Sequence, residues 1–203
     1  MKRICVFASG SGSNFQAIVE AVRSKKIKGA RVVLLVVDRK DAYVRVRAER
    51  LEIPQVFVNP LDFLSRRDYE KHLLKVLRQE KIDIVVLAGY MRILSPYFVR
   101  NFKNKILNIH PALLPAFKGT HAIERAYKYG VKVTGVTVHF VDDKVDHGPI
   151  ILQEPVKVDD GDTLEDLERK IHKVEHRLYP QAINLLLKNK LKLRGRKVFI
   201  RGG

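Results

Sequence analysis

The sequence predicts an α/β fold, with an open, mostly parallel sheet, helices on both faces and a mixed antiparallel C-terminal part. Strand-like and helix-like patterns alternate from residue 4 to residue 130. The run 32–37 is apolar throughout and rich in β-branched residues, which is typical of a strand covered on both faces. After residue 130 two β-rich runs follow each other with only a polar loop between them, which indicates antiparallel pairing.

The first hundred residues alternate between short apolar runs and helical periodicity. The first strand leads into a Gly and Ser cluster at 8–13, and Ser65–Asp68 resembles a capping box at the start of a helix. The predicted strands are 4–7, 32–37, 56–58 and 84–87, and the predicted helices are 14–22, 41–51 and 69–77.

The second half contains more strand and a long final helix. Ser95-Pro96 predicts a short helix, Thr163 and Asp166 cap the last helix, and Pro180 is expected to kink or restart it. The remaining predictions are strands 106–109, 132–141 and 150–158, a helix 122–129, and a tail hairpin from 191–193 and 198–200. In such a Rossmann-like sheet, ligands lie at the carboxyl ends of the strands.

The chain length favours one domain. We expect a single domain over 1–187, with a phosphate-binding half 1–100 and a catalytic half 101–187, followed by a basic tail 188–203. Hydrophobic residues at 46% and charged residues at 30% exclude a disordered or disulfide-stapled chain. The single cysteine, Cys5, lies in an apolar strand and is expected to be an inert buried thiol. Without a signal-peptide pattern or a long apolar run, we expect a cytoplasmic protein with no membrane partner.

The net charge of +17 raises the alternative of nucleic-acid binding. Seven of the basic residues lie in 188–203, which has no acidic residue and one aromatic residue, Phe199. A nucleic-acid surface would need a basic stripe interleaved with aromatic side chains, so no specific nucleic acid is expected. A positive field also suits small anionic substrates.

The glycine loop between the first strand and helix predicts an anion site. Gly10 and Gly12 allow close backbone approach, and helix amides would point at the anion. Phe15 stands where a dinucleotide fingerprint needs glycine, and no lysine follows as in a P-loop. A single phosphate on a small substrate therefore fits better, and a plain tight turn with Ser13 capping the helix is the alternative.

A second constellation lies at the end of the strand 106–109 and in the loop 142–149. Strand alternation places Asn108 and His110 on one side, where an amide and an imidazole would stabilise an oxyanion. Asp146 would raise the pKa of His110 if the two met, which the sequence leaves open. His147 is a rival acid or base, whereas His139, His72 and His121 are interpreted as structural or surface residues.

The helix segment His172–His176 matches the inverted H-x-x-E-H zinc signature, with Glu175 as its acidic residue. Because chance matches are common in polar helices, zinc is the less favoured interpretation.

Five sequence blocks together resemble phosphoribosylglycinamide formyltransferases, the glycinamide ribonucleotide transformylases of purine biosynthesis. The similarity covers residues 1 to 187 in order. The blocks are Ala8–Asn14, Leu87–Pro96, Asn108–Pro115, Val138–Val141 and Asp146–Ile151. This resemblance implies a formyltransferase fold and transfer of the formyl group of 10-formyltetrahydrofolate, a co-substrate, to the amine of glycinamide ribonucleotide. The products would be formylglycinamide ribonucleotide and tetrahydrofolate.

The resemblance also implies the site residues, without a metal. The catalytic residues would be Asn108, His110 and Asp146. Glycinamide ribonucleotide would contact Gly12, Ser13, Asn14, Phe15, Gln16, His172 and Glu175. The folate would contact Arg66, Met91, Arg92, Ile93, Leu94, Asn108, Asp142, Asp143, Lys144, Val145 and Asp146.

Two departures and two rivals accompany the resemblance. Ala112 stands where the family usually has serine, and His172 where lysine or glutamine is frequent near the substrate phosphate. The rival functions are a formyltetrahydrofolate hydrolase, which normally carries an extra N-terminal domain, and methionyl-tRNA formyltransferase, which carries a further C-terminal domain. We expect a monomer or a homodimer.

Overall fold

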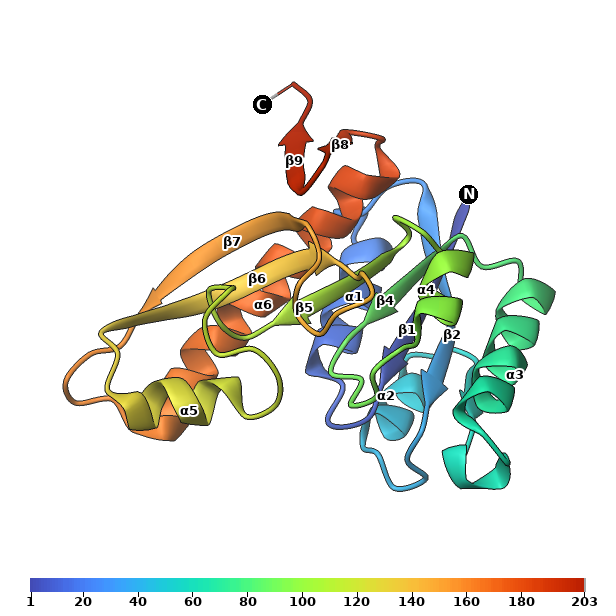
Figure 1. Cartoon of the computed structure of the whole chain (residues 1–203), viewed down its shortest axis with the longest axis horizontal. Coiled ribbons are helices and arrows are strands. Elements are labelled where there is room, and N and C mark those ends of the chain that lie inside the picture. Colours follow the sequence, from blue (N-terminus) through green and yellow to red (C-terminus); the bar gives the residue numbers. More distant parts are fainter. Residues whose placement is uncertain (203) are drawn as a thin grey trace. The chain divides into compact units, whose positions relative to one another are not determined.

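A computed structural model describes residues 1–202 (Figure 1). The strands are β1 (Lys2–Ala8), β2 (Ala30–Val37), β3 (Gln55–Phe57), β4 (Ile84–Leu87), β5 (Ile106–His110), β6 (Val133–Phe140), β7 (Ile150–Lys157), β8 (Leu191–Arg194) and β9 (Lys197–Ile200). The helices are α1 (Ser13–Arg23), α2 (Val44–Arg50), α3 (Arg66–Gln79), α4 (Pro96–Asn101), α5 (Ala122–Tyr129) and α6 (Leu164–Leu187), with a short 3₁₀ turn η1 (Pro60–Asp62).

The strand order confirms the predicted fold class. β1 to β7 form one sheet in the order β3-β2-β1-β4-β5-β6-β7. β1 pairs in parallel with β2 and β4, β2 pairs in parallel with β3, and β6 and β7 are antiparallel. The chain divides into two compact units, one from Met1 to Leu107 and the other from Asn108 to the end of the described chain. The predicted division at residues 100 and 101 stays a prediction.

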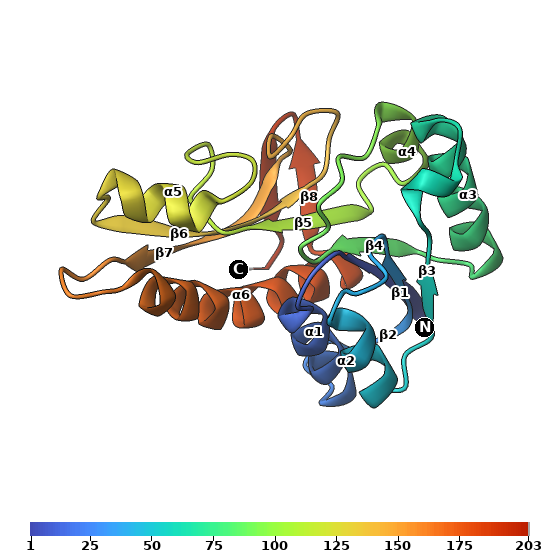
Figure 2. The same ribbon diagram turned by 90° about the horizontal axis from the view of Figure 1, so that it is seen from below.

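The first unit is built on β1, whose residues from Ile4 to Ala8 are completely buried. Its neighbours β2 and β4 are also mostly apolar and buried. Helices cover both faces of this part of the sheet, so side chains on either face are removed from water. Figure 2 shows α1 and α2 below these strands and α3 and α4 above them. Cys5 lies in this core, so the predicted burial of the thiol is confirmed, and burial raises its pKa well above the ordinary value.

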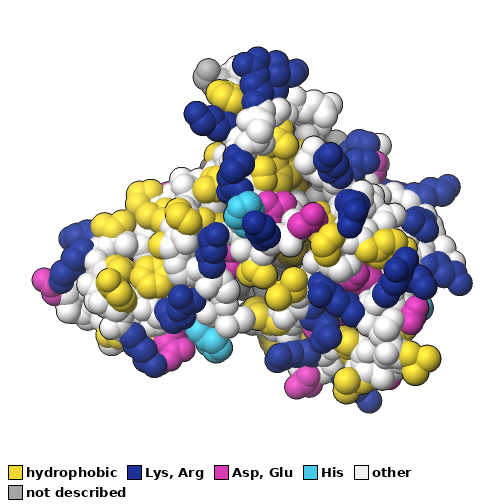
Figure 3. Space-filling view, viewed as in Figure 1, with side chains coloured by type: hydrophobic (Ala, Val, Ile, Leu, Met, Phe, Trp, Pro, Cys, Tyr) yellow, Lys and Arg dark blue, Asp and Glu magenta, His cyan; other side chains and the backbone are white. Residues whose placement is uncertain are grey.

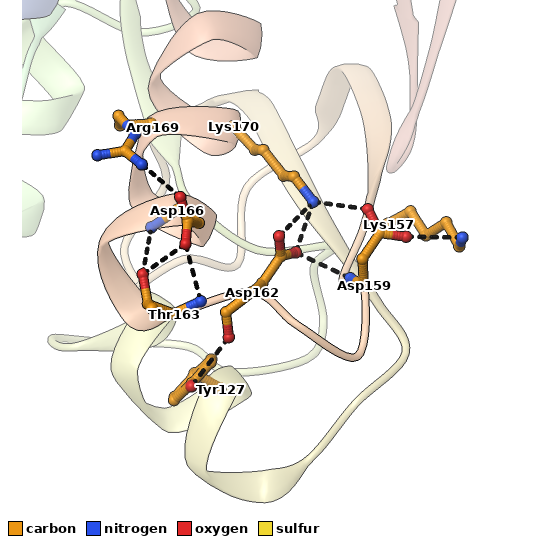
Figure 4. A network of polar contacts seen from close by, with 8 residues as sticks. All are labelled: Tyr127, Lys157, Asp159, Asp162, Thr163, Asp166, Arg169 and Lys170. Carbon is orange, nitrogen blue, oxygen red and sulfur yellow. Dashed lines mark hydrogen bonds and ion pairs between the residues drawn. The ribbon is translucent and has the colours of Figure 1, made fainter.

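The second unit pairs the antiparallel strands β6 and β7 and packs α6 against both. Thr163 caps α6: its hydroxyl accepts from the Asp166 N–H at 3.2 Å, and the Asp166 carboxylate accepts from the Thr163 N–H at 3.0 Å. Figure 4 shows that Lys170 also ties Asp159 and Asp162 to this end of the helix. The predicted cap of this last helix is therefore confirmed.

Of the two alternatives predicted at Pro180, a kink or a restart, the restart is wrong, because α6 runs without interruption from Leu164 to Leu187. The buried Ile171, Leu178 and Ile183 form one apolar stripe along it. The predicted cap by Ser13 is also wrong. The helix α1 has Gly12 as its N-cap, with φ of 77°, and no side chain caps it, so Ser13 does not have the capping role.

The tail forms the predicted hairpin. β8 pairs with β9 in antiparallel register from Leu191↔Ile200 to Arg194↔Lys197, and β9 lies against β7. In the described residues, no helix is both long enough and apolar enough to cross a membrane.

Candidate active site

The glycine loop of the first unit is held by helix α2. The Val44 N–H donates to the Gly10 carbonyl at 3.0 Å, and Val44 packs directly on Gly12. A Cβ on Gly12 would lie 2.3 Å from the Val44 Cγ2 atom, and the positive φ of Gly12 also favours glycine. The loop therefore enters α1 with the helix amides of Ser13 and Asn14 at its N-terminus, the arrangement that suits an anion.

Arg47 is a residue at this loop that the sequence analysis missed. Its Nε donates to the Ser11 carbonyl at 2.8 Å, and its Nη1 donates to the Gln16 side chain. A guanidinium thereby lies beside the predicted phosphate loop, and Gln16 is held by it. Only the basic character of the segment 45–50 hinted at this role, because the contact joins residues 36 positions apart.

The folate residues predicted in the first unit surround one pocket. The pocket has a volume of about 340 Å³ and is lined by Arg66, Tyr69, Glu70, Met91, Arg92, Ile93 and Leu94. Met91 and Ile93 are 60% and 64% exposed, so their apolar side chains face solvent at the rim. Apolar surface with a few charged groups is what a flat, partly anionic ring compound needs.

A buried carboxylate shapes this pocket. Glu70 is 2% exposed, accepts from the Ser95 N–H at 2.7 Å and pairs with Arg66 at 3.3 Å. Arg66 in turn donates to the Ile93 carbonyl at 2.5 Å, while Arg92 stacks over the ring of Tyr69. These contacts fix the segment 91–95 relative to α3.

The three predicted catalytic residues meet in the second unit. Asn108 and His110 come from β5, and Asp146 comes from the loop between β6 and β7. The Asn108 Nδ2 lies 3.3 Å from the Asp146 Oδ1, and the His110 Nδ1 lies 3.3 Å from the Asp146 Oδ2. The Asp146 Oδ2 also accepts from the Gly119 N–H at 2.8 Å. The structure thus brings together the pair that the sequence left open.

His139 belongs to this cluster, although the sequence analysis interpreted it as structural. Its Nε2 lies 3.2 Å from the Asn108 Nδ2 and 3.7 Å from the Asp146 Oδ1, and its Nδ1 faces the Phe140 carbonyl at 2.7 Å. The side chain is 2% exposed. The apolar residues around His139 indicated only a buried strand. Its place beside Asn108 follows from the sheet order, in which β6 is the neighbour of β5.

The electrostatics of His110 correct one expectation. Burial lowers the pKa of His110 more than the Asp146 charge and the Phe117 carbonyl raise it, so the pKa lies below its ordinary value rather than above it. Burial raises the pKa of Asp146, but the nearby His139, the hydrogen bond from the Gly119 N–H and the His110 charge outweigh burial. The pKa of Asp146 therefore lies below its ordinary value, which favours the ionised carboxylate. The His110 Nε2 faces the Phe117 carbonyl at 2.9 Å.

The loop that carries Asp146 is closed by its own side chains. The Asp142 Oδ2 lies 2.7 Å from the His147 Nδ1, and the Asp142 Oδ1 accepts from the Lys144 N–H at 3.1 Å. Asp143, Lys144 and Val145, predicted to contact folate, are exposed at its tip. Asp146 has a φ of 45°, a left-handed conformation that non-glycine residues adopt at some cost.

His172 and Glu175 form a pair in α6. The His172 Nδ1 lies 2.9 Å from the Glu175 Oε2, and this bond raises the pKa of His172 despite partial burial. The His176 ring stacks on His172 at a centroid distance of 6.2 Å. In residues 1–202 no group of three or more His, Cys, Asp and Glu side chains is arranged to hold a metal ion.

Comparison with known proteins places the chain in a family. The family model described as formyl transferase matches residues 2–183. The chain belongs to the formyl transferase family. This formyl transferase is 44% identical over 187 residues to the phosphoribosylglycinamide formyltransferase of Bacillus subtilis strain 168, covering 92% of this chain and 95% of that protein.

Two solved structures are similar in fold to this formyl transferase. Glycinamide ribonucleotide transformylase 1 from Symbiobacterium toebii matches with a TM-score of 0.96 at 47% identity, over 99% of this chain and 94% of that one. A formyltetrahydrofolate deformylase from Pseudomonas syringae pv. tomato matches with a TM-score of 0.89 at 26% identity, over 98% of this chain and 66% of that one. The resemblance noted in the sequence is confirmed.

Proposed function

We propose that this formyl transferase moves the formyl group of 10-formyltetrahydrofolate to the amine of glycinamide ribonucleotide. The observation that carries the proposal is the meeting of Asn108, His110 and Asp146 at the end of β5. The side-chain nitrogens of Asn108 and His110 can stabilise an oxyanion, and the Asp146 carboxylate beside them can accept and release a proton. The same reaction is supported by the similarity to a phosphoribosylglycinamide formyltransferase at 44% identity and to a glycinamide ribonucleotide transformylase at 47% identity.

Each substrate is assigned to the residues that the resemblance implies, with Arg47 added. The ribonucleotide phosphate binds at Gly12, Ser13 and Asn14, next to Phe15 and Gln16, with Arg47 as a nearby cation. Its glycinamide part and phosphate also use Glu175 and His172. The folate uses the pocket formed by Arg66 and the segment 91–94, and the segment 142–146.

The chemistry requires no group beyond the two substrates and the chain. The neutral amine nitrogen forms a bond to the formyl carbon, and the formyl oxygen becomes an oxyanion. The oxyanion accepts N–H bonds from Asn108 and from protonated His110, the form of the imidazole that carries an N–H on both ring nitrogens. The contacts of Asn108 are 3.2–3.3 Å long, so the oxyanion replaces weak partners when it forms. The bond from carbon to the folate nitrogen then breaks, and the proton of the attacking amine passes to that nitrogen by way of Asp146.

The test measures folate product spectroscopically with both substrates present and with the ribonucleotide omitted. Product that depends on the ribonucleotide supports the transferase. Product that forms equally without it identifies a formyltetrahydrofolate hydrolase, the less supported alternative, which rests on the 26% identity to the deformylase. Asn108→Ala should lower kcat about 10²- to 10³-fold, because it removes an oxyanion donor. Near-normal kcat in that variant would overturn the assigned role of Asn108.

Two further expectations stay predictions. The chain is expected to act in the cytoplasm and to be a monomer or a homodimer. Size-exclusion chromatography with light scattering would decide the second of these.

A further inference from the structure

The basic tail touches the loop that carries Asp146. Arg196, in the turn between β8 and β9, donates from Nη2 to the His147 carbonyl at 2.6 Å. Its Nη1 lies 2.9 Å from the His147 Nε2 and 3.1 Å from the Nδ1. Figure 3 shows Lys and Arg side chains gathered at the top of the molecule, where Figure 1 places this hairpin.

Asp142 and Arg196 contact different ring nitrogens of His147. The Asp142 carboxylate accepts a hydrogen bond from the His147 Nδ1–H. In this tautomer the Nε2 atom has a lone pair, which accepts a hydrogen bond from the Arg196 guanidinium. These hydrogen bonds therefore join both ends of the loop, at Asp142 and His147, to Arg196 in the hairpin. His147 is engaged on both ring nitrogens, which disfavours the rival role as catalytic acid or base considered from the sequence.

The loop 142–148 has few stabilising contacts at its tip. Asp146 keeps a left-handed φ of 45°, and Asp143, Lys144 and Val145 are exposed, so the loop tip contributes little packing that would hold the backbone at Asp146. His147 follows Asp146 directly, and a bond to its carbonyl restrains the same stretch of backbone.

We propose that Arg196 is a positioning residue, through which the C-terminal hairpin braces the loop 142–148 and sets the place of Asp146. The inference rests on the proposed function and extends it to the tail, for which the sequence suggested no role. Arg196 acts through His147, with which it forms hydrogen bonds. The neighbouring Lys197 is exposed and, in the part of the chain that the structure describes, its side chain makes no hydrogen bond or ion pair, so it carries the same charge without the brace.

The experiment compares Arg196→Ala, Arg196→Lys and Lys197→Ala in the full chain. We expect Arg196→Ala to lower kcat about 10- to 100-fold and to leave the KM for glycinamide ribonucleotide unchanged, because a misplaced catalytic group slows the chemical step. Arg196→Lys should recover part of the loss, since lysine supplies one donor to the His147 carbonyl, and Lys197→Ala should match the wild type.

Hydrogen exchange of the loop amides gives a readout that does not depend on activity. In Arg196→Ala the amides of 143–148 should exchange faster, while those of the β6–β7 ladder and the melting temperature stay unchanged. Kinetics and loop exchange equal to those of Lys197→Ala would overturn the brace. Wild-type protein without transfer activity would overturn the proposed function instead, and the exchange comparison would still decide whether Arg196 braces the loop.

Discussion

Gly148 gives the sharpest test of how closely the loop is fitted. A Cβ added at this position would lie 1.7 Å from the Phe140 carbonyl oxygen and 2.8 Å from its carbonyl carbon. Contacts of a Cβ essentially never fall below 3.0 Å, so Gly148→Ala requires a displacement of about 1.3 Å, the difference between 3.0 and 1.7 Å. Both opposing atoms are backbone and no side-chain rotation relieves the overlap.

The loop is the part that would move. Phe140 is the last residue of β6, a buried strand that pairs with β7, so the sheet holds its backbone more firmly than the loop is held. Because Asp146 is two residues from Gly148, we expect its carboxylate to shift by a similar distance. A misplacement of about 1 Å costs roughly 10²-fold in rate, and overpacking costs about 1–3 kcal/mol of stability.

The assay measures kcat/KM for the transfer together with the free energy of unfolding in urea. The matched control is Gly161→Ala, where an added Cβ meets open space and φ is not positive. We expect the control to keep wild-type values, while Gly148→Ala loses about 10² in kcat/KM and remains folded. Equal kcat/KM in the two variants would refute the reasoning that the backbone contact at Gly148 sets the position of Asp146.

Two other substitutions test the electrostatics and the phosphate loop. Asp146→Asn removes a charge that raises the pKa of His110, so this pKa, already below its ordinary value because of burial, should fall further in an NMR titration, and an unchanged pKa contradicts the pairing. Since a folded-state pKa below the unfolded value of about 6.5 makes the native state lose stability as pH falls, unfolding free energy should decrease between pH 7 and 5, and more so in Asp146→Asn. Arg47→Ala removes the bonds to Ser11 and Gln16 and should raise the KM for glycinamide ribonucleotide roughly tenfold at unchanged KM for folate, by the loss of a charged hydrogen bond. The exposed Arg50 of the same helix is the control, and an equal KM in Arg50→Ala would count against a specific role for Arg47.

Local patterns were sufficient for much of the fold. The apolar run 32–37 and the alternation of periods predicted the sheet, and Ser65, Ser95 and Thr163 predicted helix starts, because strand burial and capping depend on neighbours within a few residues. The continuous course of α6 through Pro180 was not predictable in this way. Packing of its apolar stripe outweighs the local cost of proline, and that packing involves distant strands.

The candidate site divides along the same line. Strand alternation alone placed Asn108 and His110 on one side of β5, and the motif blocks alone indicated the family, since both depend on the order of residues. The sequence by itself therefore determined the fold class, the family and the candidate residues.

Only the tertiary structure decided which of those residues meet. Asp146 reaches His110 from a loop 36 positions away, His139 enters from β6, and Arg196 reaches His147 across 49 positions. The direction of the His110 pKa shift was also decided there, because burial, set by everything packed around the ring, exceeds the pairwise attraction of Asp146. Such contacts and desolvation depend on how the strands are ordered in space, which residue spacing along the chain does not encode locally.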